Sequence, residues 1–267
     1  MSGKGKNAID MTGGSLWKNI LVFSLPLMMT QMLEVLFNLS DVAIAGKYAD
    51  YIALGAVGST ALLVSLFTGI LIGMGAGVNV RTAHQLGAEK TSGSSETVAR
   101  TVYSGLIVCL IIGIILCLVC NIFARPMLET LKTKDELIES AVLYLKIYAL
   151  GMPAMAVYNF GNGVLSACGE TKKPLVYLSI AGVLNVILNI FFVVVCKKAA
   201  DGVAIASVIA QYLSASMIMC HLLRRKDSCK LRLSNKYFDT SACGGVLMIG
   251  IPLSLIHISE PTRPEPI

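Results

Sequence analysis

The sequence predicts an all-α integral membrane protein with six membrane-spanning helices and the start of a seventh. Three observations support this fold class. The 267 residues are 55% hydrophobic and only 14% charged, with a mean hydropathy of +0.73, whereas soluble domains carry about 25% charged residues. Apolar runs long enough to cross a bilayer recur along the chain. The basic residues behind the net charge of +6 lie in the short segments between these runs, which indicates topology and not nucleic-acid binding.

The alternation of apolar and polar segments divides the chain into five parts. These are a cytoplasmic N-terminus at 1–15, a six-helix lobe at 16–223, a basic cytoplasmic linker between lobes at 224–240, the start of a seventh helix at 241–252, and a tail at 253–267. The N-terminal part lacks the apolar core and cleavage site of a secretory signal. Within the lobe we expect spans at 16–46, 52–80, 97–123, 135–166, 175–196 and 202–223, with a polar loop at 81–96.

The first span carries a polar face. Gln31, Glu34, Asn38 and Asp41 fall within an arc of about 80° at 100° per residue. A carboxylate in mid-membrane costs about 2.5–3.5 kcal/mol, so it usually faces a bundle interior or a wet cavity. We therefore predict that these four residues line a binding cavity. The alternative is that Asp41 lies at the membrane edge and Glu34 pairs with a neighbouring helix. Pro26 predicts a bend early in this helix.

The second and third spans carry packing signals and no metal motif. Gly69, Gly73 and Gly77 repeat every four residues, a spacing that lets helices approach closely. Cys117 and Cys120 have CxxC spacing, but they lie in an apolar run without a nearby histidine. We interpret them as buried thiols, and the sequence predicts no cofactor and no firm metal site.

The fourth and fifth spans add amides to the predicted cavity. Gly151 and Pro153 predict an irregular fourth span, which also carries Asn159 and Asn162. For Asn159, a kink that serves only packing is an equal alternative. Asn185 and Asn189 are four residues apart in the fifth span, so they lie one above the other on the same helix face.

The distribution of basic residues predicts the orientation. With the N-terminus in the cytoplasm, fourteen Lys and Arg residues fall on the cytoplasmic side and seven on the outer side. This asymmetry favours a multi-pass protein of the cell membrane with a cytoplasmic N-terminus.

A second copy of the lobe begins after the linker. The segment GVLMIGIPL resembles ILVFSLPL of the first span, and Pro252 would correspond to Pro26, 226 residues earlier. Residues 253–267 then read LSLIHISEPTRPEPI, and LSLIHISEPTR resembles the conceptual translation of a transposon-type sequencing-library adapter. We therefore expect the natural sequence to stop near Pro252 or Leu253, with the tail non-native and about six further spans missing. His257 and Glu260 receive no role.

Several segments resemble the multidrug and toxic compound extrusion (MATE) transporters. SLPLMMTQMLEVLFNLSDVAIAG resembles the first helix of that family, AHQLGAEK its second-to-third connection and GVLSACGETKKPL its fourth-to-fifth connection. LNVILNIFF followed by DGVAIASVIAQ resembles the fifth helix and the start of the sixth. The resemblance covers nearly all of residues 11–252.

The resemblance implies one six-helix lobe of a two-lobe MATE-type transporter, which exchanges a substrate for H⁺ or Na⁺. Asp41 matches the first-helix carboxylate of the family and Asn185 its fifth-helix asparagine. Asn189 stands where some members carry an aspartate, so the lobe lacks a second family carboxylate unless Glu34 compensates. The coupling ion, H⁺ or Na⁺ with Na⁺ at Asp41, stays undecided.

The leading hypothesis is a secondary exporter of cationic amphipathic small molecules, whose partners are the lipid bilayer and the missing second lobe. A lipid-linked-saccharide flippase of related architecture would need a cationic cavity, whereas the intramembrane charges here are acidic. An enzyme is not predicted, because the sequence holds no HExxH, no GxSxG and no paired catalytic His and Asp. A non-transporting membrane scaffold is the remaining alternative, and the buried polar face argues against it.

Overall fold

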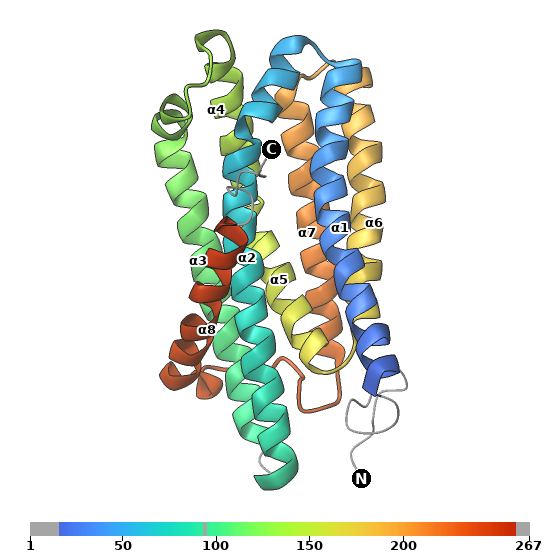
Figure 1. Ribbon diagram of the computed structural model, residues 1–267, viewed down its shortest axis with the longest axis vertical. Coiled ribbons are helices and arrows are strands. Elements are labelled where there is room, and N and C mark those ends of the chain that lie inside the picture. Colours follow the sequence, from blue (N-terminus) through green and yellow to red (C-terminus); the bar gives the residue numbers. More distant parts are fainter. Residues whose placement is uncertain (1–15, 93–94, 260–267) are drawn as a thin grey trace.

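A computed structural model describes residues 16–92 and 95–259 of the chain (Figure 1). The elements in chain order are α1 (Leu16–Tyr48), α2 (Tyr51–Ser92), α3 (Ser95–Thr130), α4 (Asp135–Ala149), α5 (Met152–Ala167), α6 (Lys172–Ile190), the π-helical turn η1 (Phe191–Val195), α7 (Ala200–Arg224), the 3₁₀ turn η2 (Asn235–Tyr237) and α8 (Thr240–Ser259). The expected cytoplasmic segment 1–15 and residues 260–267 of the expected tail lie outside the described part.

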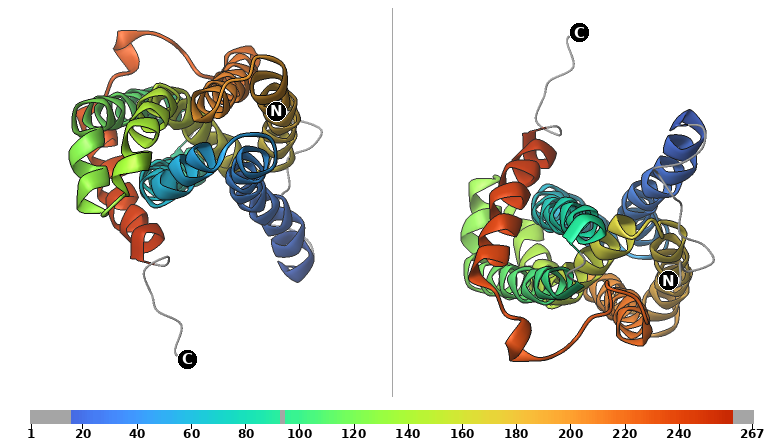
Figure 2. Two further views of the ribbon diagram at one scale, coloured as in Figure 1. Left: turned by 90° about the horizontal axis from the view of Figure 1, so that it is seen from above. Right: turned by 90° about the horizontal axis from the view of Figure 1, so that it is seen from below.

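The helices form one elongated bundle. Among the described residues, five helices are long and apolar enough to cross a membrane, and the count reaches six when α4 and α5 are taken as one bent span. Viewed along the long axis, α1, α6 and α7 lie on one side and α3, α4 and α8 on the other, with α2 and α5 between them (Figure 2). The all-α membrane fold with six spans that the sequence predicts is thus confirmed.

The predicted polar loop at 81–96 is wrong for most of its length. Helix α2 continues to Ser92 and α3 begins at Ser95. The segment RTAHQLGAEKTS is rich in Ala, Gln, Leu, Glu and Lys, which favour helix in water as well as in lipid. The end of the apolar run at 80 therefore does not end the helix, which continues to Ser92.

The fourth span is broken, as Gly151 and Pro153 predict. Helix α4 ends at Ala149, α5 begins at Met152, and the two axes are bent by 45°. Pro153 lies in the first turn of α5, where the missing N–H of proline costs no helical hydrogen bond. After the bend, α5 packs against α2, α3 and α7, and most of its side chains are buried in the interior of the lobe.

Glycines on α2 allow two close helix crossings. A Cβ at Gly77 would lie 2.8 Å from the Cα of Gly250 on α8, and a Cβ at Gly75 would lie 2.6 Å from the carbonyl oxygen of Asn159 on α5. The glycine repeat therefore packs closely against α8, as predicted. The neighbouring Gly75, which is not part of the repeat, packs closely against α5. Helix α8 itself extends to Ser259, seven residues beyond the predicted end at 252, so the first residues of the expected tail are helical.

The linker after α7 folds back onto the lobe. The backbone N–H of Leu231 donates to the carbonyl of Leu222 at 3.2 Å, and the Ser228 hydroxyl donates to the Glu89 carboxylate of α2 at 2.6 Å. A disulfide joins Cys168, after α5, to Cys229 of the linker. Cys117 and Cys120 are free thiols; Cys120 is buried, as interpreted from the sequence, whereas Cys117 is only half-buried. The first residues of the linker are therefore part of the lobe.

Candidate functional site

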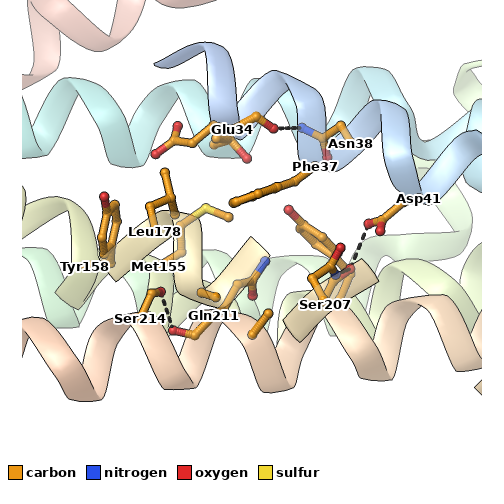
Figure 3. Close-up of a pocket in the computed structure, with 15 residues that line it drawn as sticks. Glu34, Phe37, Asn38, Asp41, Met155, Tyr158, Leu178, Ser207, Gln211 and Ser214 are labelled. Atoms are coloured by element: carbon orange, nitrogen blue, oxygen red, sulfur yellow. Dashed lines mark hydrogen bonds between the residues drawn. The ribbon is translucent and has the colours of Figure 1, made fainter. Parts of the chain in front are cut away.

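A cavity of about 60 Å³ lies inside the lobe, between α1, α2 and the helices α4 to α7 (Figure 3). Each of these six helices contributes lining residues from the face that it turns inward. The lining residues are Glu34, Phe37, Asn38, Asp41, Thr68, Tyr148, Met155, Tyr158, Leu178, Ala181, Asn185, Ser207, Ala210, Gln211 and Ser214. Glu34 lies toward the end of the labelled side chains where Tyr158 is, and Asp41 lies at the opposite end (Figure 3).

Asp41 is held in a closed ring of hydrogen bonds. The hydroxyl of Ser207 on α7 donates to Asp41 Oδ2 at 2.7 Å, and Nδ2 of Asn189 on α6 donates to Asp41 Oδ1 at 2.6 Å. Asn189 Nδ2 also donates to Asn185 Oδ1 at 3.2 Å, while Asn185 Nδ2 donates to the Ser207 oxygen at 3.1 Å. Asp41 is only 3% exposed, so the ring replaces water around a buried carboxylate.

The ring also leaves one oxygen atom open to a cation. Oδ1 of Asn189 is buried and accepts no hydrogen bond in the described part of the chain. The amide nitrogen of the same side chain donates to Asp41. Carboxylate and amide oxygens are the ligands that hard cations prefer in proteins. This end of the cavity can therefore hold a proton on Asp41 or a small cation among the oxygens of Asp41, Asn185, Asn189 and Ser207.

Glu34 lies at the other end, in different surroundings. Its Oε2 is buried and has no hydrogen-bond partner in the described part of the chain. The amide of Asn38 donates at 3.2 Å to the backbone carbonyl of Glu34 and not to its carboxylate. Apolar and aromatic side chains from α1, α5 and α6 line this end of the cavity (Figure 3). The sequence left open that Glu34 pairs with a neighbouring helix. Its Oε2 makes no such pair in the described part of the chain.

The structure divides the predicted site residues between two cavities. Asp41, Glu34, Asn38 and Asn185 line the first, and Asn189 contacts Asp41 beside it. Gln31 and Asn162 instead line a second cavity of about 280 Å³ between α1, α2 and α5. The other polar residues of that second cavity are Asn79, Asn159 and Ser166.

Sequence reasoning missed the contribution of α7. Ser207, Gln211 and Ser214 all line the first cavity, and Ser207 is a direct hydrogen-bond partner of Asp41. The signal was present, since these residues are spaced i, i+4 and i+7 in an otherwise apolar span and so share one helix face.

Comparison with known proteins shows a consistent likeness. The family model described as MatE matches residues 26–191, well over half of the chain. The chain is 27% identical over 221 residues to "Probable multidrug resistance protein YpnP" of Bacillus subtilis (strain 168), a match that covers 82% of this chain and 48% of that protein. It is 22% identical over 244 residues to "Multidrug export protein MepA" of Staphylococcus aureus (strain NCTC 8325 / PS 47), covering 91% of this chain and 53% of that protein.

The fold has solved counterparts. A multidrug resistance MATE family transporter of the MOP superfamily in an outward-facing conformation superposes with a TM-score of 0.85 at 22% identity, covering 97% of this chain and 56% of that chain. A MATE structure in a bent conformation gives a TM-score of 0.84 at 23% identity, covering 93% of this chain and 55% of that chain. These likenesses establish the fold. The chain spans about half the length of the curated relatives and solved structures that it matches.

Proposed function

Since the chain belongs to the MatE family, we propose that the whole protein is a secondary antiporter which exports organic cations, such as drugs or toxic metabolites, in exchange for H⁺ or Na⁺. The observation that supports this most directly is the buried Asp41, held by Ser207 and Asn189 from two other helices. A carboxylate inside a membrane-spanning bundle is costly, and such residues mark substrate or ion pathways.

The exchange follows from charge. With no ion bound, the carboxylates of the first cavity give the lobe a negative interior that attracts an organic cation. Loading H⁺ or Na⁺ at Asp41 neutralises part of that charge and weakens the hold on the organic cation, which then leaves on the outer side. The coupling therefore requires only that both ligands respond to the same buried charge.

A lipid-linked-saccharide flippase is less well supported than an exporter of cations. A site for a diphosphate needs basic side chains, yet the described lining of both cavities contains no Lys or Arg. The charges that face the interior are the carboxylates of Glu34 and Asp41.

We further propose that the protein lies in the cell membrane with its N-terminus in the cytoplasm, and that a second lobe completes the transport path. The chain spans about half of its relatives, and alternating access in transporters built from repeats moves one half against the other.

The proposal is tested by reconstituting the whole protein in liposomes and imposing an H⁺ or a Na⁺ gradient, each alone. We expect one of the two gradients to drive accumulation of ethidium, a fluorescent organic cation, and collapse of that gradient with the matching ionophore to release it. If neither gradient moves ethidium above the level of protein-free liposomes, the proposed function is wrong.

A further inference from the structure

Two cysteines that are distant in the sequence meet where the linker leaves the lobe. Cys168 directly follows α5, Cys229 lies in the linker 61 positions later, and a disulfide joins them. All eight cysteines of the chain lie in its described part, and the other six are free thiols. The bond therefore connects one particular pair, and it attaches the linker to the connection between α5 and α6.

The side of the membrane on which this pair lies bears on its role. Lys172 and Lys173 follow Cys168, and the basic residues 224–226 precede Cys229, so both segments belong to the side proposed to be cytoplasmic. Thiols are kept reduced in the cytosol, and the few disulfides that form there are mostly transient and respond to redox conditions. A permanent cross-link is not expected at this position, whereas a reversible one is.

The two residues differ in exposure, which sets the order of the chemistry. Cys229 is only 2% exposed, whereas Cys168 is half-buried, so a small molecule reaches Cys168 first. The Cys168 thiolate attacks a low-molecular-weight disulfide, forms a mixed disulfide and releases one thiol. The Cys229 thiolate then attacks the Cys168 sulfur and releases the second thiol. Two electrons pass from the protein to the small disulfide, and two small thiols reverse both steps.

Non-covalent contacts hold the linker on either side of Cys229. The Ser228 hydroxyl donates to Glu89 of α2 at 2.6 Å, and the backbone N–H of Leu231 donates to the carbonyl of Leu222 at 3.2 Å. Contacts of this kind open and close in the native protein, whereas a disulfide stays closed until it is reduced. Reduction therefore leaves the linker folded on the lobe and allows it to detach.

The bond also sets how much chain is free to connect the lobe to α8. Helix α7 ends at Arg224 and α8 begins at Thr240, so fifteen residues, 225–239, join them. With Cys229 fixed to the lobe, ten of these residues, 230–239, remain free. At 3.3–3.6 Å per residue, the maximum reach falls from about 50 Å to about 35 Å. Alternating access moves one half of a transporter against the other, and this segment is the chain that follows the movement.

We infer that Cys168 and Cys229 form a reversible redox site, at which a low-molecular-weight disulfide such as oxidised glutathione oxidises the two thiols and fixes the linker to the lobe. The reduced linker detaches and lets the two halves move, and the oxidised linker slows their movement. This inference goes beyond the proposed function, because the bond and the detachment of the linker are both measured without transport.

The redox site is tested on the purified whole protein, equilibrated without oxygen in buffers of reduced and oxidised glutathione. Alkylation followed by peptide mass spectrometry reports which cysteines are bonded. We expect the Cys168–Cys229 bond to form in oxidised glutathione and to be lost at the cytosolic glutathione potential. A bond that survives the cytosolic potential would make the pair a permanent cross-link, and thiols that persist in oxidised glutathione would exclude the site. Either result overturns the inference.

The effect on the linker is measured by hydrogen exchange at the amide of Leu231, which donates to Leu222. We expect exchange at least tenfold faster in the reduced protein than in the oxidised one. Cys168→Ser and Cys229→Ser should exchange at the fast rate in both buffers. Cys220→Ser removes an exposed free thiol of α7 and is the matched control, which should behave as the wild type does. Equal rates in the reduced and oxidised wild type would show that the bond does not hold the linker.

Export by the whole protein in liposomes tests the last step. We expect export at least threefold slower with the pair oxidised than reduced, and no difference between the two conditions in Cys168→Ser. Equal export rates in the two states of the wild type would overturn the control of movement by the bond. A wild type that exports in neither state would contradict the proposed function instead, and the exchange of Leu231 would still report on the redox site.

Discussion

Ser207 on α7 donates a 2.7 Å hydrogen bond to Asp41 on α1, across 166 positions of sequence. The bond joins the first and last spans of the lobe. Both of its ends are buried, because Asp41 is 3% and Ser207 is 5% exposed. Hydrogen bonds to a charged group are roughly twice as strong as those between neutral groups. The contact therefore ties the site to the packing of the lobe.

Ser207→Ala should lower the stability of the lobe. Removing this donor leaves Asp41 with one fewer partner in a buried site, at a cost of about 1.5–3 kcal/mol for a bond to a charged group. Thermal unfolding of the purified protein in detergent measures the change. Ser216→Ala is the control on the same helix, because its exposed hydroxyl donates only to the carbonyl of Tyr212. Equal midpoints for the two variants would show that the Ser207 bond contributes nothing.

Asp41→Asn should abolish ion-coupled export across pH 6 to 8 while membrane insertion and folding persist. The amide keeps the size of the carboxylate and removes its negative charge. The site then no longer attracts H⁺ or Na⁺. Export is measured in liposomes at several pH values, and Asp135→Asn, on the exposed first turn of α4, is the control. Export at the wild-type rate over this pH range would contradict a coupling site on α1 and would point to the second lobe.

Gly77→Ala should weaken the docking of α8. A Cβ there would lie 2.8 Å from backbone atoms of Gly250 and Val246, and since backbone cannot rotate away, the helices must separate, at about 1–3 kcal/mol. Gly58→Ala on the same helix is the control, because a Cβ at that position meets nothing within 4 Å and alanine favours helix over glycine by about 1 kcal/mol. We expect opposite shifts in thermal midpoint. A shift of the same sign and size in both would show that α8 does not rest on this crossing.

The sequence predicted what depends on neighbours within one helix. The polar face of α1, the Asn185–Asn189 pair and the break at Gly151 all follow from helical spacing or from local backbone chemistry. What it could not predict depends on contacts between distant segments. The placement of Gln31 and Asp41 in different cavities depends on where the other helices pack against α1. The folding of Cys229 onto Cys168 likewise depends on the path of the linker.

The linker is held by a buried ion pair, and its strength should depend on pH. Glu170, 6% exposed, lies 2.7 Å from Nζ of Lys173 and 3.4 Å from the guanidinium of Arg225, the first residue after α7. Burial by itself raises the pKa of Glu170, but the hydrogen bond from Lys173 and the positive charges of Arg225, Lys173 and His221 outweigh it, so the pKa falls below its ordinary value of 4.5. A carboxyl group with a lowered folded-state pKa stabilises the fold fully above its unfolded pKa, near 4.5, and this contribution is lost as the pH falls through the folded pKa.

Glu170→Gln should therefore destabilise the protein at neutral pH, by on the order of 3 kcal/mol, because the cations lose their buried counter-charge. The difference in thermal midpoint from the wild type should shrink as the pH drops below 4.5 and through the lowered pKa of folded Glu170, because the wild-type carboxylate then becomes neutral as well. Glu96→Gln breaks an exposed pair with Arg100 and should cost less than about 1 kcal/mol at any pH. A Glu170→Gln difference that stays constant from neutral to acidic pH would show that the charge of Glu170 does not hold the linker.

The proposed orientation can be measured without transport. Thr97, at the exposed start of α3, belongs to the side assigned to the cytoplasm, and Asp135, at the exposed start of α4, to the outer side. In a cysteine-free background of the whole protein, a membrane-impermeant thiol reagent added to intact cells should label Asp135→Cys and spare Thr97→Cys. Permeabilising the cells should then expose both. Since both positions are exposed in the structure, a difference between them before permeabilisation reports the membrane barrier and not burial within the protein. Labelling of Thr97→Cys alone in intact cells would reverse the proposed orientation.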